Sequence, residues 1–220
     1  MLNENFKYEP VFVSTQYALW REDQDFMSLN ELADYTLVDF YKCFGIWQLA
    51  KQQKDVEGCY LEVGVYKGGT ATLISKAANI YAPDKNIYLA DTFEGVVKVS
   101  EIDSHYSGGE HSEPITTVES LMEKYEIKNY KILKGIFPDD TGFEIKEPIA
   151  LLHSDCDVYD STKDIVEWAI PRMSKGGIIV FDDYGFQSCP GVTQYVNEIS
   201  QSKDFLFIYN LNGHGLLIKR

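Results

Sequence analysis

Short apolar runs alternate with amphipathic stretches along most of this 220-residue chain. Short apolar runs bounded by polar or glycine-rich segments are typical of buried strands, and apolar positions three and four residues apart are typical of helices. On this basis strands are expected at residues 59–65, 86–90, 130–134, 149–153, 177–181, 205–209 and 215–219. Helices are expected at residues 37–54, 69–78, 117–126, 162–173 and 190–200.

This alternation predicts an α/β fold with a mainly parallel, seven-stranded sheet and helices on both of its faces. The last two strands flank residues 210–214, whose asparagine and glycine predict a C-terminal antiparallel hairpin. One face of the first long helix is expected to carry Leu37, Phe40, Tyr41, Phe44, Trp47 and Leu49-Ala50. Ser161 and Asp164 have the spacing of a capping box at the start of the 162–173 helix.

Residues 1–36 are polar and aromatic without a clear period, and are interpreted as an arm or cap ahead of one domain spanning residues 37–220. The arm is too aromatic for a disordered segment, and its rings are Phe6, Tyr8, Phe12, Tyr17 and Trp20. They are expected to pack on the body, over the active site or on a second subunit, so a homo-oligomer is an open alternative. Residues 94–116 form the longest irregular stretch, which is typical of a lid or binding loop, with His105 and His111 as candidate substrate contacts.

The composition limits the partners that we expect. A formal net charge of −14 argues against a nucleic-acid backbone or an anionic membrane as partner. No apolar run reaches membrane-spanning length and the first residues lack a signal pattern, so we expect a cytoplasmic protein. The four cysteines show no C-x-x-C spacing, which favours reduced thiols over a zinc site; they are Cys43, Cys59, Cys156 and Cys189.

Acidic residues directly follow two of the expected buried strands. Asp155 lies just beyond the 149–153 run, and Asp182 with Asp183 follows the 177–181 run. The carboxyl ends of parallel strands meet at one edge of a sheet, and adjacent carboxylates repel each other unless water or a cation neutralises them. The three acids therefore predict a site for Mg²⁺ or a similar hard cation. Such an ion lowers the pKa of a bound hydroxyl, and a neighbouring acid can take its proton.

Two nearby residues have less certain roles. Asp157 is interpreted either as an acid behind these ligands or as a cap for the following helix. His153 is interpreted as a hydrogen-bonded strand residue rather than as a base.

A glycine-rich turn joins the first expected strand to its helix in Glu62-Val63-Gly64-Val65-Tyr66-Lys67-Gly68-Gly69-Thr70. Glycines there allow a sharp turn and the close approach of a ligand. The spacing is not G-x-G-x-x-G, so a dinucleotide is disfavoured and a cofactor without phosphate, such as S-adenosylmethionine, fits better. Glu62 would suit its cationic groups, and Asp91 at the end of the next strand can accept both ribose hydroxyls. Gly135 and Phe137 follow the third strand, where they could flank an adenine.

Asp91 alone does not exclude NAD, which leaves a nucleotide-dependent oxidoreductase as a more distant alternative. Tyr159 and Lys163 even have the Y-x-x-x-K spacing of short-chain dehydrogenases. The glycine-rich turn of those enzymes is absent from the sequence, so we interpret this spacing as chance.

In combination the motifs resemble the macrocin O-methyltransferase (TylF/MycF-type) family, from about Leu37 to the C-terminus. They are the glycine-rich turn, Asp91-Thr92-Phe93-Glu94-Gly95, Asp155-Cys156-Asp157-Val158-Tyr159-Asp160-Ser161-Thr162, and Asp182-Asp183-Tyr184-Gly185 with Cys189-Pro190-Gly191. The resemblance implies a Rossmann-like class I methyltransferase fold and a metal-dependent O-methyltransferase that uses S-adenosylmethionine. It also implies Asp155 as general base and metal ligand, with Asp182 and Asp183 as the other ligands.

The expected cofactor-binding positions are Glu62, Gly64, Tyr66, Gly68, Thr70, Asp91, Thr92, Phe93, Gly135, Phe137 and Asp155. Members of this family methylate hydroxyls of sugars on macrolides, of nucleotide sugars and of aromatic antibiotics. The expected acceptor is therefore a sugar-containing small molecule of natural-product or polysaccharide biosynthesis, with a phenolic acceptor as the alternative.

Overall fold

The computed structural model describes residues 18–210 and 213–220, which form one seven-stranded sheet of order β3-β2-β1-β4-β5-β7-β6. Its strands are β1 (Cys59–Val63), β2 (Ile87–Asp91), β3 (Tyr130–Lys134), β4 (Ile149–Ser154), β5 (Met173–Phe181), β6 (Phe205–Tyr209) and β7 (Gly215–Lys219). Strands β1 to β5 pair in parallel, whereas β7 is antiparallel to both β5 and β6. The predicted mainly parallel sheet with a C-terminal antiparallel hairpin is confirmed.

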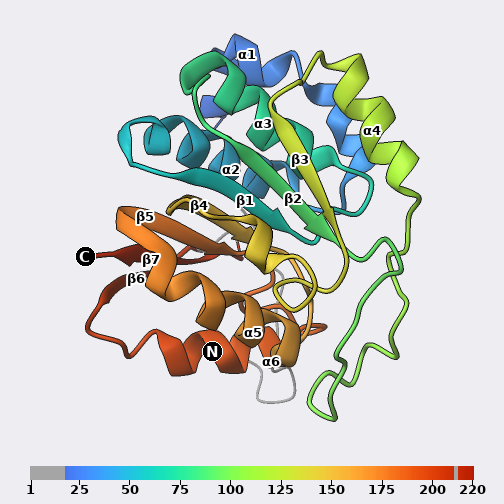
Figure 1. Ribbon diagram of the computed structural model, residues 1–220, viewed down its shortest axis with the longest axis vertical. Coiled ribbons are helices and arrows are strands. Elements are labelled where there is room, and N and C mark those ends of the chain that lie inside the picture. The colour runs from blue at the N-terminus through green and yellow to red at the C-terminus, as the bar shows by residue number, and fades with distance from the viewer. Residues whose placement is uncertain (1–17, 211–212) are drawn as a thin grey trace.

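Helices cover both faces of this sheet, as predicted (Figure 1). They are α1 (Gln24–Met27), α2 (Phe40–Gln52), α3 (Gly69–Tyr81), α4 (Ile115–Lys124), α5 (Tyr159–Ala169) and α6 (Pro190–Ile199). Every residue of β1 is buried, because successive side chains enter opposite cores. Tyr60 packs in the core that contains α2, α3 and α4, and Leu61 packs in the core that contains α5 and α6.

The chain order places a ligand crevice between β1 and β4. From β1 the chain runs through α3 and α4 to β2 and β3, and then returns to β4 on the other side of β1. Open α/β sheets bind ligands beyond the carboxyl ends of strands at such a reversal. Gly64 follows β1 here with φ +90°, and a Cβ at this position would overlap the carbonyl oxygen of Asp155. Glycine is therefore required for the two strand ends to lie this close.

The prediction for the helix after β4 was partly wrong. Helix α5 begins at Tyr159 rather than at residue 162, and its N-cap, Val158, makes no side-chain capping bond. The predicted capping box of Ser161 and Asp164 is absent, because the Ser161 hydroxyl donates a 2.9 Å hydrogen bond to the carbonyl of Val97. The serine thus ties the long loop to α5 instead of starting the helix.

The predicted apolar face of the first long helix also needs correction. Leu37 is 69% exposed and precedes α2, while Phe40 and Tyr41 are 37% and 45% exposed. Both rings contact Trp20, with centroids 5.6 and 5.2 Å away, so they are covered in part by the preceding segment. The buried side of α2 consists of Lys42, Cys43, Phe44, Ile46, Trp47 and Ala50.

Residues 18–36 pack on the body, which is one of the arrangements expected for the arm. Phe26, Leu29 and Leu32 are buried in the same core as α2. Four of the arm's aromatic residues, Phe6, Tyr8, Phe12 and Tyr17, lie outside the described residues, as do residues 211–212 of the hairpin turn. The boundary between residues 36 and 37 stays a prediction.

Asp23 joins this segment to α2. Its carboxylate accepts hydrogen bonds from the Phe26 amide, the Trp47 indole, the Gln48 amide and the Lys51 ammonium, at 3.1, 2.9, 3.2 and 2.8 Å. Burial alone would raise the pKa of Asp23, but the bonds from Lys51, Phe26 and Trp47 outweigh it and lower the pKa.

The long loop after β2 is held by a buried acid. Asp103 is fully buried, and one of its carboxylate oxygens accepts hydrogen bonds from the amide and hydroxyl of Ser100 at 3.1 and 2.7 Å. The other oxygen accepts the amide of Tyr159, the first residue of α5, at 3.0 Å. The loop is therefore anchored to the helix that follows β4.

No helix within residues 18–210 and 213–220 combines the length and the apolar character needed to cross a membrane. All four cysteines are free thiols.

Replacement of Gly64 by alanine tests the contact between β1 and β4. We expect Gly64→Ala to lower the free energy of unfolding by about 3 kcal/mol or more, because it combines a positive φ with overlap against the Asp155 backbone. Gly185→Ala is the matched control: its φ is also +90°, but no atom lies within 4 Å of the added Cβ, so about 1 kcal/mol is expected. Urea denaturation followed by circular dichroism measures both, and equal losses would contradict the argument.

The Asp23 contacts predict a pH-dependent loss of stability. Asp23→Ala should lower the free energy of unfolding by about 2 kcal/mol at pH 7, since it removes a helix cap and the bond to Lys51. Because the folded-state pKa is lowered, this stability is present above the unfolded value of about 3.9 and is lost as the pH falls through the folded value. Denaturation at pH 7 and below pH 4 measures the difference in the free energy of unfolding between wild type and Asp23→Ala. We expect this difference to be smaller below pH 4 than at pH 7. Asp55→Ala, at a side chain 87% exposed, should change little at either pH.

Candidate functional site

A cavity of about 340 Å³ opens at the carboxyl edge of the sheet, within the usual size range of small-molecule sites. Its walls come from the β1–α3 turn, the ends of β2, β4 and β5, the segment before α2 and the loop after β2. Most of the positions expected to bind a cofactor line it, namely Gly64, Tyr66, Thr70, Asp91, Thr92, Gly135, Phe137 and Asp155.

The structure does not bring Glu62, Gly68 or Phe93 to this cavity. Glu62 is buried in β1, and its carboxylate lies 2.8 Å from Nδ1 of His153. Gly68 is the left-handed N-cap of α3, and Phe93 packs in the hydrophobic core. The spacing of the motifs did not distinguish these three residues from the residues that line the cavity.

Asp91 shapes the turn that follows β1. Its Oδ2 accepts the amides of Val65 and Tyr66 at 2.6 and 3.0 Å, and its Oδ1 accepts the amide of Phe93 at 2.6 Å. Each carboxylate oxygen has two lone pairs, so Oδ2 is already satisfied and Oδ1 can accept one further hydrogen bond from a ligand in the cavity. The residue predicted to bind a ribose therefore also preorganises the turn around it.

The predicted convergence of the three strand-end carboxylates is confirmed. Asp155, Asp182 and Asp183 each offer an oxygen within 4.8 Å of the others. Ser154 of β4 lies in register with Phe181 of β5, which aligns the acids that follow the two strands. Asp182 and Asp183 are buried, whereas Asp155 is partly accessible.

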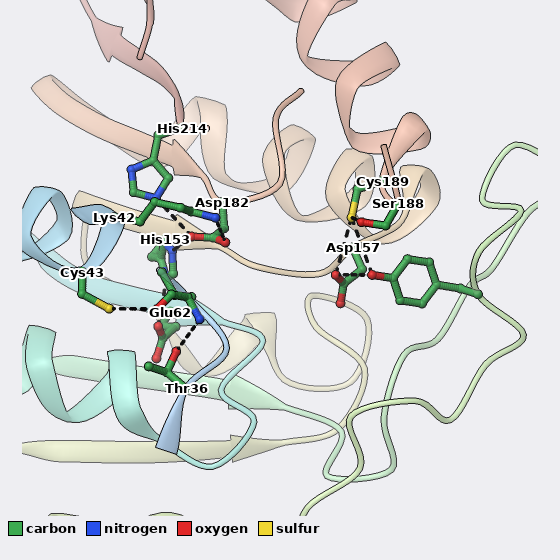
Figure 2. Close-up of polar contacts among 12 residues, drawn as sticks. Thr36, Lys42, Cys43, Glu62, His153, Asp157, Asp182, Ser188, Cys189 and His214 are labelled. Carbon is green, nitrogen blue, oxygen red and sulfur yellow. Dashed lines mark hydrogen bonds and ion pairs between the residues drawn. The ribbon is translucent and has the colours of Figure 1, made fainter. Parts of the chain in front are cut away.

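Asp182 is surrounded by positively polarised groups of the chain (Figure 2). Lys42 forms an ion pair with its Oδ2, while Nε2 of His153 and Nε2 of His214 lie 3.4 and 3.1 Å from its Oδ1. Burial alone would raise the pKa of Asp182, but the hydrogen bonds of His153 and His214 and the charge of Lys42 hold it well below its usual value. Asp182 is therefore a carboxylate that the protein itself neutralises.

His153 lies between two carboxylates. Nδ1 lies 2.8 Å from Glu62 and Nε2 lies 3.4 Å from Asp182, an arrangement that favours a proton on each ring nitrogen. Burial opposes this charge, but the bonds to Asp182 and Glu62 raise the pKa of His153 to about 10. The structure supports the interpretation of His153 as a hydrogen-bonded strand residue.

Asp155 and Asp183 are in the opposite situation. Burial, followed by the charges of Asp182 and Asp183, raises the pKa of Asp155 well above its usual value. Burial, followed by the charges of Asp157 and Asp182, does the same for Asp183. Oδ2 of Asp183 is buried with no hydrogen-bond partner among the described residues. Both carboxyl groups line the cavity, and the ion pairs that neutralise Glu62 and Asp182 include neither of them.

A second cluster of polar side chains, centred on Asp157, also lines the cavity. The hydroxyl of Tyr106 donates a 2.7 Å hydrogen bond to Asp157, and Cys189 lies beside both residues (Figure 2). Asp157 is therefore not the helix cap considered above. Its neighbour His111 lines the cavity with its ring 6.3 Å from that of Tyr106, whereas His105 is exposed and away from the cavity.

Sequence reasoning missed two residues of the acidic centre, Lys42 and His214. Lys42 carried a usable signal, because it is a lysine within the otherwise apolar run Tyr41–Phe44 of an expected helix. His214 carried none, since it follows the hairpin turn and reaches Asp182 only through the pairing of β7 with β5.

The alternative dehydrogenase motif gains no support from the geometry. The Tyr159 hydroxyl donates a 2.9 Å hydrogen bond to Glu198, and neither Tyr159 nor Lys163 lines the cavity.

Comparison with solved structures supports the fold class. The O-methyltransferase NovP aligns with a TM-score of 0.73 at 22% identity, covering 84% of this chain and 82% of that one. A calicheamicin methyltransferase aligns with a TM-score of 0.69 at 18% identity, covering 94% of each chain. The expected Rossmann-like methyltransferase fold is confirmed.

Comparison with known sequences finds O-methyltransferases. The mycinamicin III 3″-O-methyltransferase of Micromonospora griseorubida is 29% identical over 147 residues, which are 61% of this chain and 58% of that protein. The 8-demethyl-8-(2,3-dimethoxy-α-L-rhamnosyl)-tetracenomycin-C 4′-O-methyltransferase of Streptomyces olivaceus is 28% identical over 145 residues, 61% of this chain and 56% of that protein. The matches thus span little more than half the length of these relatives.

The family assignment rests on a longer match. The family model described as macrocin-O-methyltransferase (TylF) matches residues 46–207, from α2 to β6. This range contains the glycine-rich turn, Asp91 and all three acids at the ends of β4 and β5. The chain therefore belongs to the macrocin-O-methyltransferase family.

Proposed function

We propose that this protein transfers a methyl group from S-adenosylmethionine to a hydroxyl of a sugar carried by a small molecule, with a divalent cation such as Mg²⁺ at the acidic centre. The observation that carries the proposal is that the turn held by Asp91 and the acids Asp155, Asp182 and Asp183 open onto one cavity. The names of the relatives, which include a 4′-O-methyltransferase of a rhamnosyl-tetracenomycin-C, support the choice of reaction and of a glycosylated acceptor.

The β1–α3 turn suits a cofactor without phosphate. Phosphate sites present free backbone N–H groups, but the amides of Val65 and Tyr66 are already bonded to Asp91. What remains is Oδ1 of Asp91 at the cavity wall, which can accept one ribose hydroxyl rather than the two expected from the sequence. S-adenosylmethionine, when bound, supplies a methyl carbon that the acceptor oxygen takes as the carbon–sulfur bond breaks.

The donor set at the strand ends suits a hard divalent cation. Carboxylate oxygens are the ligands that Mg²⁺ prefers, and burial with neighbouring acids raises the pKa values of Asp155 and Asp183, so a cation would be needed to favour their charged forms. The buried, unbonded Oδ2 of Asp183 is the atom that most needs such a partner. A cation bound there would lower the pKa of an acceptor hydroxyl.

The residues of the chain then have distinct tasks. Asp155 is partly accessible, and we assign to it the role of accepting the hydroxyl proton. The thiols of Cys156 and Cys189 line the same cavity, but burial raises their pKa values, so they stay protonated and do not compete as nucleophiles. Alignment of acceptor and methyl donor accounts for most of the remaining rate enhancement.

Asp155→Asn should separate cofactor binding from catalysis. The variant loses the base, so we expect kcat to fall by about 10²- to 10⁴-fold. The affinity for S-adenosylhomocysteine, measured by calorimetry, should change by less than about threefold, because most of the cofactor wall is untouched. Methyl transfer is followed by mass spectrometry on nucleotide sugars and on macrolide glycosides, with a catechol as the phenolic comparison.

Asp160→Asn is the matched control for this experiment, because Asp160 lies in the same motif but is exposed and away from the cavity. It should keep wild-type activity. An Asp155→Asn enzyme that keeps its activity would refute the role assigned to Asp155. NAD binding in place of S-adenosylhomocysteine would refute the reaction class.

Asp183→Asn should stabilise the protein when metal is absent. A folded-state pKa raised by burial and by neighbouring acids means that stability is lost as the pH rises through it, so at pH 8 the charged group is unfavourable. We expect the variant to gain about 1–2 kcal/mol in the free energy of unfolding at pH 8 in EDTA. Thermal and urea denaturation with and without Mg²⁺ measure this.

The neighbouring Asp182→Asn variant is the control with the opposite sign, since it breaks the ion pair with Lys42 and should destabilise. Saturating Mg²⁺ should stabilise the wild type more than Asp183→Asn. A loss of stability in Asp183→Asn in EDTA would contradict the charge balance described above.

A further inference from the structure

Lys42 is an unusual component of this site. It lies on the buried side of α2, its side chain is 3% exposed, and it lines the cavity. Its ammonium forms the ion pair with Oδ2 of Asp182 and lies 4.6 Å from the ring centroid of Phe186. A lysine is almost never buried to this degree unless it is paired, so Asp182 accounts for its position.

The contacts of Asp182 are divided between its two oxygens. Oδ2 is held by Lys42, and Oδ1 is held by His153 and His214 at 3.4 and 3.1 Å. Asp182 nevertheless offers an oxygen within 4.8 Å of ligand atoms of Asp155 and Asp183. A monovalent cation of the chain thus contacts the same carboxylate that a divalent cation in this group would use.

We propose that Lys42 is a resident cation of the acidic centre, which holds Asp182 when no metal is bound and competes with the divalent cation for it. This inference rests on the metal centre of the proposed function. It makes Lys42 a positioning residue, since it acts through Asp182. It also leaves Asp155 and Asp183, the two acids outside the ion pairs, as the ligands that the metal meets first.

The arrangement of charges predicts whether the loss of Lys42 strengthens or weakens metal binding. Lys42 and a divalent cation would repel each other across a distance of a few ångströms in a largely buried site. Removal of the ammonium should therefore tighten metal binding, although it removes a stabilising partner. A purely structural ion pair predicts the opposite combination, which is lower stability with unchanged metal affinity.

The experiment compares wild type with Lys42→Met, and with Lys51→Met as the matched control on the same helix. Lys51 also pairs with an aspartate, Asp23, but at the outer surface of α2 and away from the cavity. Calorimetric titration with MgCl₂ measures affinity, and thermal unfolding in EDTA and in saturating Mg²⁺ measures stability. None of these readouts depends on methyl transfer.

For Lys42→Met we expect a melting temperature lower by on the order of 10 °C in EDTA, because a buried carboxylate loses its partner. Saturating Mg²⁺ should recover at least half of that loss, and the Mg²⁺ affinity should be at least about tenfold tighter than that of wild type. Lys51→Met should show a smaller loss that Mg²⁺ does not change. Wild-type Mg²⁺ affinity in Lys42→Met, with a loss of stability that Mg²⁺ does not recover, would overturn the proposal.

A double variant covers the possibility that Lys42→Met does not fold. Lys42→Met with Asp182→Asn removes both charges, so it should unfold in EDTA within a few degrees of wild type. A double variant as unstable as Lys42→Met alone would overturn the pairing argument. If no variant, wild type included, bound Mg²⁺, the metal centre of the proposed function would be refuted together with the competition. Mg²⁺ binding by wild type that the loss of Lys42 leaves unchanged would refute the competition alone.

Discussion

The rest of the site depends on the burial of several carboxylates at one edge of the sheet with only part of their charge balanced by the chain. Lys42 pairs with Asp182, and His153 lies between Asp182 and Glu62, while Asp155 and Asp183 keep raised pKa values at the cavity and take part in none of these contacts. If the chain balanced the charge of every carboxylate, the cluster would be more stable but would not attract a further cation. In the proposed function this imbalance favours cation binding, and it lowers the stability of the protein without a ligand.

Backbone packing places this cluster where it is. The close approach of Gly64 to the Asp155 carbonyl and the register of β4 with β5 determine where the three acids begin. Asp91 performs the corresponding task for the cofactor half, because it holds the turn at Val65 and Tyr66 before any ligand arrives. Hydrogen bonds to Asp91 therefore hold the proposed cofactor half in place. In the acidic half, backbone packing holds the carboxylates close together although their charges repel one another.

Local patterns were sufficient to predict the sheet, the helices on both faces and the meeting of Asp155, Asp182 and Asp183, because each feature follows from strand order and strand ends. They were insufficient for contacts that depend on packing between distant elements. Periodicity alone did not reveal that Phe40 and Tyr41 face outward beneath Trp20, or that Ser161 bonds to the long loop rather than capping α5. His214 reaches Asp182 only through the pairing of β7 with β5, and no sequence motif reports such a contact.

The two halves of the cavity also differ in how closely the fold of the family restricts their residues. The proposed cofactor wall and the acids lie at strand ends, where the sheet restricts the positions of residues. The wall around Asp157 instead receives Tyr106 and His111 from the loop after β2, which is anchored through Asp103 to the start of α5. Loops tolerate changes of length and sequence far better than strand ends do. The proposed chemistry therefore rests on the strand ends, while the proposed acceptor would be selected by the loop.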